Sequence, residues 1–310
     1  MRILVTGGAG YLGSVLVGHL LRKGYTVTVV DNLLYRTHGL YQYCCDPRFD
    51  FVRGDVRDES LMKALLADKD AIIALAAIVG MPACARNPEA AKSTNYEAIK
   101  MMNRLRSPEQ WVLYPCTNSG YGTKSGEVFC TEETPMEPIS LYGRTKTDAE
   151  RLLLDSPNTI SLRLATVFGV SSRMRLDLLV NDFTHRAVTD RYLVLYEKDF
   201  KRNFVHIEDV AGAFCHAVAN FEAMKGGPYN VGLDDANLSK EQLALTIKKF
   251  VPELYIHEAT VATDPDKRNY IVSNAKIRSK GFAASHSLEE GIGQLIKAFR
   301  MLSQSDFSNQ

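Results

Sequence analysis

Two residues of one short segment could carry a proton transfer. Tyr142 and Lys146 lie four positions apart in a segment with helical spacing, which places both side chains on one helix face. A free tyrosine has a pKa of about 10, too high for a general base near neutral pH. A neighbouring ammonium group stabilises the phenolate and lowers that pKa. The pair therefore predicts a tyrosine that takes a proton from a substrate hydroxyl.

A second group of residues could hold a dinucleotide. Gly7, Gly10 and Gly13 follow an apolar run and open a helical segment. Glycines at these positions let the backbone turn tightly and let a pyrophosphate approach the helix N-terminus. A glycine pattern alone is weak evidence, but Asp31 ends the next apolar run. A carboxylate there accepts hydrogen bonds from a ribose diol and repels a 2′-phosphate, which favours NAD over NADP.

Two further strand ends support the same cofactor site. Asp55 and Val56 follow the third apolar run, and Ala76 and Ala77 follow the fourth. Arg36, a few residues beyond the acidic position, could soften the preference for NAD, but we interpret it as a loop arginine. The predicted cofactor-binding residues are Gly7, Gly10, Tyr11, Leu12, Gly13, Asp31, Asn32, Asp55, Val56, Ala76, Ala77, Tyr142 and Lys146.

The elements that must position these residues alternate between strand and helix. Apolar runs predict strands at Ile3–Val5, Tyr25–Val30, Phe51–Arg53, Ala71–Leu75, Trp111–Tyr114 and Ile160–Leu164. Helical spacing predicts helices at Ser14–Lys23, Ser60–Leu66, Ala90–Leu105 and Gly143–Leu154. This alternation predicts an α/β fold with a Rossmann-type, doubly wound parallel sheet.

The pattern changes after about residue 165, where the segments become more polar and irregular. Helices are predicted at Leu176–Thr189, Ile207–Asn220, Ser239–Phe250 and Leu288–Leu302. We therefore predict an NAD-binding Rossmann domain over 1–165 and a smaller, mostly helical C-terminal substrate lobe over 166–310. A segment of that lobe is expected to return to the main sheet.

Composition excludes several classes of protein. The 310-residue chain is 45% hydrophobic and 24% charged, which is typical of a globular enzyme. A net charge of +1 provides no strong electrostatic attraction to nucleic acid or to a membrane surface. Neither is therefore an expected partner. The six cysteines form no CxxC pair and have no histidine cluster beside them, so we expect reduced thiols and no metal. No signal peptide or membrane span is indicated, which predicts a cytoplasmic protein.

The segment after the fifth predicted strand adds a family resemblance. Pro115–Gly122, together with the glycine motif, the acidic positions and the Tyr-Lys pair, resembles the extended short-chain dehydrogenase/reductase family, especially its nucleotide-sugar enzymes. The resemblance covers nearly the whole chain. It implies a catalytic triad of Thr117, Tyr142 and Lys146, with Ser119 as the alternative hydroxyl.

The residues after Thr117 bear on the type of reaction. In this family the 4,6-dehydratases carry an Asp-Glu pair there, the decarboxylases carry a Glu two positions on, and the epimerase-reductases carry a Cys. Asn118 and Ser119 stand in those places here. Neither is a carboxylate base near neutral pH. The remaining chemistry is oxidation or reduction at a sugar hydroxyl, or 4-epimerisation through a transient ketone.

Substrate recognition also follows from the resemblance. The segment from Arg202 resembles a family motif whose arginine contacts the nucleotide diphosphate, with Asn203 in place of the usual Asp. Thr166 likewise replaces the usual Asn of another motif. The implied substrate-binding residues are Ser119, Arg175, Asn181, Arg202 and Arg268.

Three segments narrow the resemblance further. Thr117–Gly122, Arg173–Phe183 and Asp264–Asn274 are similar to bacterial enzymes that oxidise GDP-manno-heptose at C4 for capsule or lipopolysaccharide assembly. This similarity implies a GDP-sugar substrate and a return of NADH to NAD, by a second keto substrate or by cofactor exchange. Family analogy implies a homodimer through helices near Ala90–Leu105 and Tyr142–Leu154. The alternatives are a nucleotide-sugar 4-epimerase and, less favoured because the Tyr-Lys pair is intact, a non-catalytic NAD-binding regulator.

Overall fold

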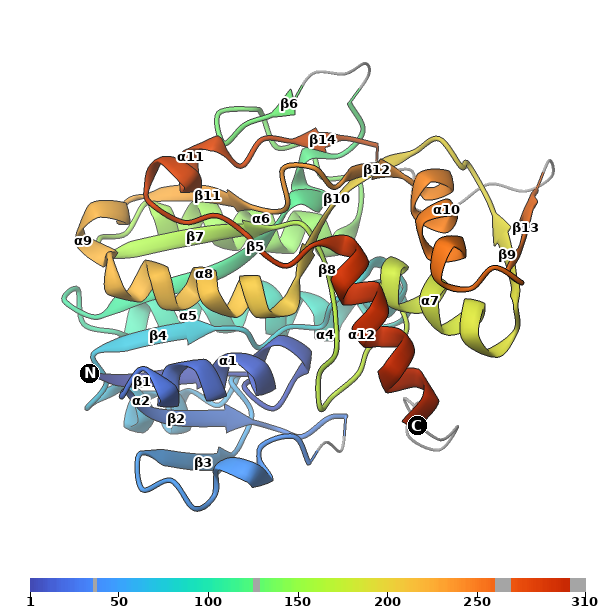
Figure 1. The fold of residues 1–310 in the computed structure, drawn as a ribbon. Helices are drawn as coiled ribbons and strands as arrows, with labels where there is room; N and C mark the ends of the chain where they lie inside the picture. The colour runs from blue at the N-terminus through green and yellow to red at the C-terminus, as the bar shows by residue number, and fades with distance from the viewer. Residues whose placement is uncertain (36–37, 125–128, 260–268, 302–310) are drawn as a thin grey trace.

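A seven-stranded parallel sheet forms the centre of the molecule (Figure 1). The computed structural model describes residues 1–35, 38–124, 129–259 and 269–301. The strands, in sheet order, are β11 (Gly227–Val231), β7 (Thr159–Leu164), β5 (Trp111–Thr117), β4 (Ala71–Ala74), β1 (Arg2–Thr6), β2 (Thr26–Asp31) and β3 (Phe49–Arg53). Every neighbouring pair is parallel, which confirms the predicted Rossmann-type sheet.

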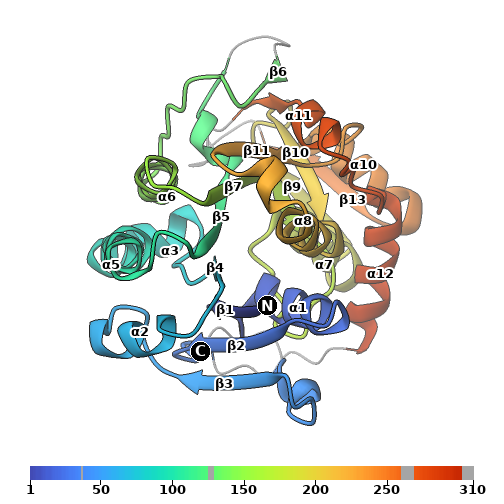
Figure 2. The same ribbon diagram turned by 90° about the vertical axis from the view of Figure 1, so that its left-hand side faces the viewer.

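Helices cover both faces of this sheet (Figure 2). One face carries α1 (Tyr11–Arg22) and α8 (Ile207–Ala219); the other carries α2 (Glu59–Leu66), α5 (Ala98–Leu105) and α6 (Leu141–Leu154). Alternate side chains of a strand point to opposite faces. Thus Ile3 and Val5 of β1 join the core beneath α1 and α8, while Leu4 joins the core beneath the other three helices.

The order of the strands creates a crevice next to β1. The chain moves from β1 to β2 and β3 on one side and then crosses to β4 on the other. Loops leaving β1 and β4 at their carboxyl ends therefore diverge, and open α/β sheets bind ligands at such a switch point. The glycine motif lies in the loop after β1.

A strand from the second half of the chain extends the sheet at one edge, and a helix from the same half covers one of its faces. α8 packs against α1, and β11 pairs with β7 at the edge. The division of the chain at residue 165 stays a prediction. No helix of the described ranges is long and apolar enough to cross a membrane, and the cytoplasmic location stays a prediction.

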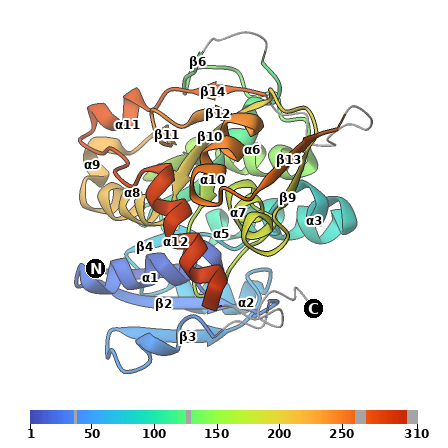
Figure 3. The same ribbon diagram turned by 45° about the vertical axis from the view of Figure 1, so that its right-hand side comes forward.

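The remaining C-terminal elements form a lobe beside the carboxyl ends of the sheet (Figure 3). Helices α7 (Leu179–Thr189), α10 (Lys240–Phe250) and α12 (Leu288–Met301) pack against one another around a separate apolar core. Three small sheets accompany them: β8 (Thr166–Phe168) with β10 (Lys201–His206) and β12 (Asn237–Ser239), β9 (Tyr192–Leu195) with β13 (Tyr255–Glu258), and β6 (Phe129–Cys130) with β14 (Ile271–Val272). These small sheets were not predicted, because strands of two to six residues leave little periodicity in the sequence.

One predicted helix has a more complex form. The segment expected at Ala90–Leu105 begins as α4 (Pro88–Lys92), passes through a π-helical turn at Ser93–Glu97 and continues as α5. Short helices not predicted from sequence are α3 (Met81–Arg86), α9 (Phe221–Met224) and α11 (Ala275–Ser279), with 3-10 turns at Tyr41–Tyr43 and Asn118–Tyr121. Asn95 in the π-turn accepts from the Ile78 N–H at 2.8 Å and donates to the Ile78 carbonyl at 2.9 Å. The turn is thereby tied to the chain that leaves β4.

Candidate active site

The glycine motif packs too tightly for side chains. Gly7 has φ +69°, and a Cβ atom there would lie 2.6 Å from the Ala76 Cα. A Cβ atom on Gly13 would lie 2.6 Å from the Gly8 Cα. The backbone of the β1–α1 turn therefore approaches the loop after β4 closely, and the N-terminus of α1 faces the crevice. This shape fits the pyrophosphate of a dinucleotide.

Asp31 is fixed at the end of β2 by two backbone donors. The Ala9 N–H donates to its Oδ2 at 3.0 Å, and the Leu33 N–H donates to its Oδ1 at 2.8 Å. Burial raises the pKa of Asp31, and these hydrogen bonds oppose that rise. The carboxylate thus lies beside the glycine loop, where the ribose of a bound dinucleotide is expected.

Asp55, after β3, has a different environment. Its pair with Arg57 lowers the pKa of Asp55 to about 2, and the Asn32 amide also donates to it, at 3.4 Å. Val56 and Ala76 line one small pocket near the crevice. The predicted residues therefore gather at the carboxyl ends of β1 to β4, with Gly10 and Leu12 at the start of α1 and Ala77 after β4.

The Tyr11 side chain links the two lobes. Its hydroxyl donates to the Gly169 carbonyl at 2.7 Å and accepts from the Asn181 amide at 3.2 Å. Asn181 also accepts from the Gly169 N–H and donates to the Arg175 carbonyl. Tyr11 and Asn181 therefore stabilise the packing of these segments. The role of Tyr11 in binding the cofactor and that of Asn181 in binding the substrate stay predictions.

Lys146 lies buried on α6, and its Nζ is 4.0 Å from the centre of the Tyr114 ring. Ser140 caps the N-terminus of this helix, and its Oγ accepts from the Gly143 N–H at 3.1 Å. Burial lowers the pKa of Lys146 to about 8, against the opposing effects of Cys116, Glu150 and Cys84.

The two candidate hydroxyls lie together at the end of β5. The Thr117 Oγ1 donates to the Ser119 Oγ at 3.0 Å and accepts from the Ser119 N–H at 3.1 Å. The 3-10 turn that contains Ser119 packs against α6, which carries Tyr142 in its first turn and Lys146 in its second. The structure thus brings the predicted catalytic elements together.

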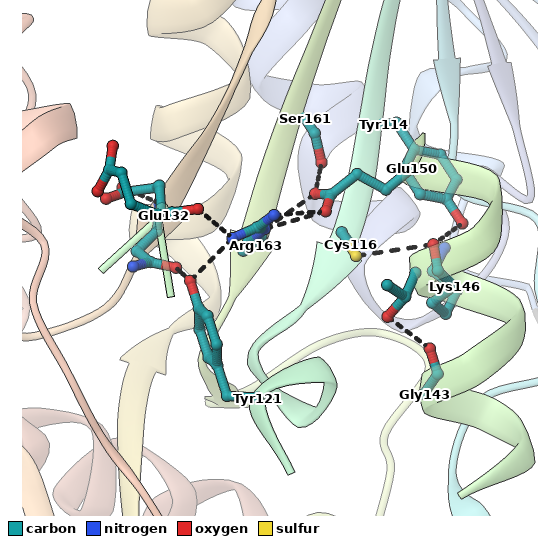
Figure 4. Close-up of polar contacts among 12 residues, drawn as sticks. Tyr114, Cys116, Tyr121, Glu132, Gly143, Lys146, Glu150, Ser161 and Arg163 are labelled. Carbon is teal, nitrogen blue, oxygen red and sulfur yellow. Dashed lines mark hydrogen bonds and ion pairs between the residues drawn. The ribbon is translucent and has the colours of Figure 1, made fainter. Parts of the chain in front are cut away.

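A buried network of hydrogen bonds and one ion pair lies beneath these residues and was not predicted from the sequence (Figure 4). Arg163 of β7 pairs with Glu150 of α6, one helical turn beyond Lys146. The other side of its guanidinium donates to the Tyr121 hydroxyl at 3.1 Å and to the Glu132 carbonyl at 3.0 Å. A charged residue within the apolar run of β7 is the one sequence signal for this network.

Asn118 is a second residue whose role was not predicted. From the sequence it was noted only as a position without a carboxylate base. Its side chain is fully buried, and neither amide atom has a hydrogen-bond partner in the described part of the chain. An unsatisfied buried amide costs about 1–3 kcal/mol. Its place directly after Thr117 makes it a candidate for contact with a ligand.

The arginines predicted to bind substrate occupy different surroundings. Arg175 pairs with Asp177 and lies near Gly80 after β4, and its charge also interacts with Tyr142. Arg202 is buried, with its guanidinium 5.8 Å from the Tyr270 ring. Arg268 lies outside the described residues. Within the described ranges, no group of three or more His, Cys, Asp or Glu residues could hold a metal ion.

The fold and the site together define a dinucleotide-dependent enzyme with a Tyr-Lys pair next to the cofactor crevice. The chain belongs to the NAD dependent epimerase/dehydratase family, which it matches over residues 3–232. Family membership confirms the predicted cofactor, NAD, and the broader prediction of an NAD-dependent enzyme of the extended short-chain dehydrogenase/reductase type.

Individual relatives act on nucleotide sugars. The chain is 28% identical to UDP-glucuronic acid decarboxylase 1 of Arabidopsis thaliana, over 97% of this chain and 70% of that protein. It is 27% identical to UDP-glucose 4-epimerase of Lactobacillus helveticus, over 75% and 76%. Among solved structures, UDP-glucuronic acid 4-epimerase of Bacillus cereus, in complex with UDP-glucuronic acid and NAD, has the same fold. The TM-score is 0.86 at 24% identity, over 98% of this chain and 100% of that one.

Proposed function

We propose that this protein is an NAD-dependent oxidoreductase that acts at C4 of a nucleotide-activated sugar, and that it oxidises GDP-manno-heptose to a 4-keto sugar for capsule or lipopolysaccharide synthesis. One observation carries the proposal. Thr117 and Lys146 lie in a buried site beside the cofactor crevice, yet the two positions after Thr117 hold Asn118 and Ser119. The site therefore has an amide and a hydroxyl at the two positions where elimination or decarboxylation would need a carboxylate.

The proposed chemistry assigns one task to each side chain. The glycine loop and Asp31 would hold NAD, which would supply a hydride acceptor for the carbon that bears the reacting hydroxyl. Tyr142 takes the hydroxyl proton, and the Lys146 ammonium stabilises the phenolate form of Tyr142. Thr117, held by its contacts with Ser119, donates to the reacting oxygen. These steps need no further acid or base.

Substrate contacts are proposed for residues around this centre. Arg175 and Arg202 suit a diphosphate, because a guanidinium binds two phosphate oxygens at once. Asn118 would complete its hydrogen bonds with a sugar substituent, which supports a polar group near the reacting carbon. Ser119, Asn181 and Arg268 remain proposed contacts as well.

A 4-epimerase is the second candidate. The same side chains support it, because a transient ketone formed at C4 can accept the hydride on its other face. Relatives named as 4-epimerases, such as the UDP-glucose 4-epimerase of Lactobacillus helveticus, favour this candidate. We also propose a homodimer, formed through α5 and α6 as in the family analogy.

Product analysis distinguishes the two reactions. The absorbance of the purified protein near the reduced-nicotinamide band is recorded first, and GDP-manno-heptose is then added with NAD. A rise in that band with a 4-keto product by mass spectrometry supports the dehydrogenase. If the reduced band is present at the start, keto acceptors should bleach it. Isomerisation of a UDP- or GDP-hexose, with no change on GDP-manno-heptose, assigns the 4-epimerase instead. Tyr142→Phe should abolish either activity, and undiminished turnover would overturn the catalytic assignment.

A further inference from the structure

An arginine from the C-terminal lobe reaches the adenosine end of the cofactor site. Arg173 lies in the loop between β8 and α7, and its guanidinium carbon is 4.1 Å from the centre of the Tyr35 ring. Tyr35 stands four residues after Asp31, in the loop that follows β2. The contact therefore joins two loops that lie 138 positions apart in the chain (173 minus 35).

The loop that carries Arg173 is held against the start of α1. The Ser171 Oγ donates to the Tyr11 carbonyl at 2.7 Å and lies 2.9 Å from the Ser14 Oγ. The Arg173 N–H donates to that same Ser171 Oγ at 3.3 Å, and Ser172 reaches the Gly39 carbonyl at 3.4 Å. These bonds fix the backbone that carries Arg173 beside the α1 N-terminus, and the Tyr35 ring holds its guanidinium.

Arg173 and Asp31 interact through their charges. Burial raises the pKa of Asp31, while the hydrogen bonds from Leu33 and Ala9 and the positive charge of Arg173 lower it. Burial and the neighbouring Arg175 lower the pKa of Arg173, and Asp31 is among the groups that oppose this. The guanidinium thus lies on the Tyr35 ring, in the loop that follows Asp31, and its charge acts on the Asp31 carboxylate.

We propose that Arg173 is a cofactor-specificity residue: it forms the outer wall of the adenosine-ribose pocket and offers a cation that binds a 2′-phosphate once the Asp31 carboxylate is removed. A guanidinium stacked on an aromatic ring keeps its N–H donors in its own plane, where they suit phosphate oxygens. In the native protein the Asp31 carboxylate repels the phosphate and selects NAD. The chain therefore contains a latent NADP site that a single carboxylate blocks.

Binding to the cofactor-free protein tests this inference, with NAD and NADP titrated separately by calorimetry. Asp31→Ser should strengthen NADP binding by about 10-fold or more, because it removes one repulsive charge. Adding Arg173→Ala to that variant should remove most of the gain in NADP affinity, read as the ratio of the NADP to the NAD affinity in the same variant. The matched control is Asp31→Ser with Arg53→Ala, because the exposed Arg53 pairs in register with Asp31 across β2 and β3. That control should keep the gain.

Three results would overturn the proposal. Asp31→Ser could fail to strengthen NADP binding, or the gain could survive Arg173→Ala, or the gain could depend on Arg53 instead. If the double variant Asp31→Ser with Arg173→Ala binds neither NAD nor NADP, the double variant Asp31→Ser with Arg173→Lys is titrated in the same way. Restored NADP binding supports a role for the positive charge, and a lysine that restores NAD alone rejects it. Since no sugar is present in these titrations, their outcome is independent of the proposed reaction.

Discussion

The Arg163 guanidinium donates three hydrogen bonds of 2.8 to 3.1 Å to the Glu150 carboxylate. The two side chains are only 8% and 3% exposed, so the pair joins β7 to α6 in a region of low dielectric. Glu150 lies one helical turn from Lys146, and its negative charge opposes the loss of the Lys146 proton. The pair therefore connects the core of the sheet with the electrostatics of the candidate site.

Removing one partner of this pair should destabilise the protein strongly. Arg163→Met leaves a buried carboxylate without its partner, and the expected loss in the free energy of unfolding is about 3–5 kcal/mol. Arg163→Met combined with Glu150→Met should cost less than the single change. Urea denaturation measures both. Arg104→Ala, which breaks the exposed pair with Glu59, is the control and should cost less than about 1 kcal/mol. An equally small effect for Arg163→Met would contradict the argument.

Lys146 predicts a characteristic pH dependence of stability. Burial holds its pKa in the folded state at about 8, below the ordinary lysine value of 10.5, so the unfolded chain binds more protons between these two pH values. Stability then rises with pH in this window, by up to about 3 kcal/mol from this group. Lys146→Met lacks that contribution. Between pH 8 and 10.5 the unfolding free energy of the wild type should therefore rise relative to that of Lys146→Met. A difference that stays constant over this range would show that burial does not lower the pKa of Lys146.

The hydroxyl at Thr117 should matter more than the one at Ser119. Thr117→Val removes the proposed donor to the reacting oxygen, and kcat is expected to fall by about 10²-fold or more. Thr117→Ser keeps the hydroxyl and should retain most of the activity. Ser119→Ala removes a partner of Thr117 and should have a smaller effect. Steady-state kinetics compares the three variants, and a larger loss for Ser119→Ala would exchange the two roles.

Glycine 13 should be essential for cofactor binding and not simply for helix formation. In Gly13→Ala the new Cβ atom would lie 2.6 Å from backbone atoms of Gly8, so the loop must shift and NAD affinity should fall by about 10-fold or more. Gly293→Ala in α12 is the matched control, because its added Cβ would meet open space beyond the backbone of its own helix. That control should bind NAD normally and gain about 0.5–1 kcal/mol of stability. Equal NAD affinity in both variants would show that the glycine loop tolerates a side chain.

Local patterns were sufficient for much of the fold and of the site. The parallel sheet follows from short apolar runs that alternate with helical spacing, because each strand or helix buries one face through its own periodicity. Asp31 and Asp55 could be placed because acidic residues at successive strand ends meet at one edge of a parallel sheet. Tyr142 and Lys146 could be paired because a spacing of four is a local property of a helix.

Contacts between distant segments needed the tertiary structure. Arg163 and Glu150 are 13 positions apart, and Arg173 and Tyr35 are 138 apart, on elements whose packing no local pattern specifies. Burial also sets the electrostatic role of Lys146, because desolvation in the interior lowers the pKa of its ammonium group. The residue types and their local spacing thus determined the elements and the candidate chemistry. Long-range packing decided which charges are buried and paired, because desolvation and pairing depend on neighbours that come together only in the folded chain.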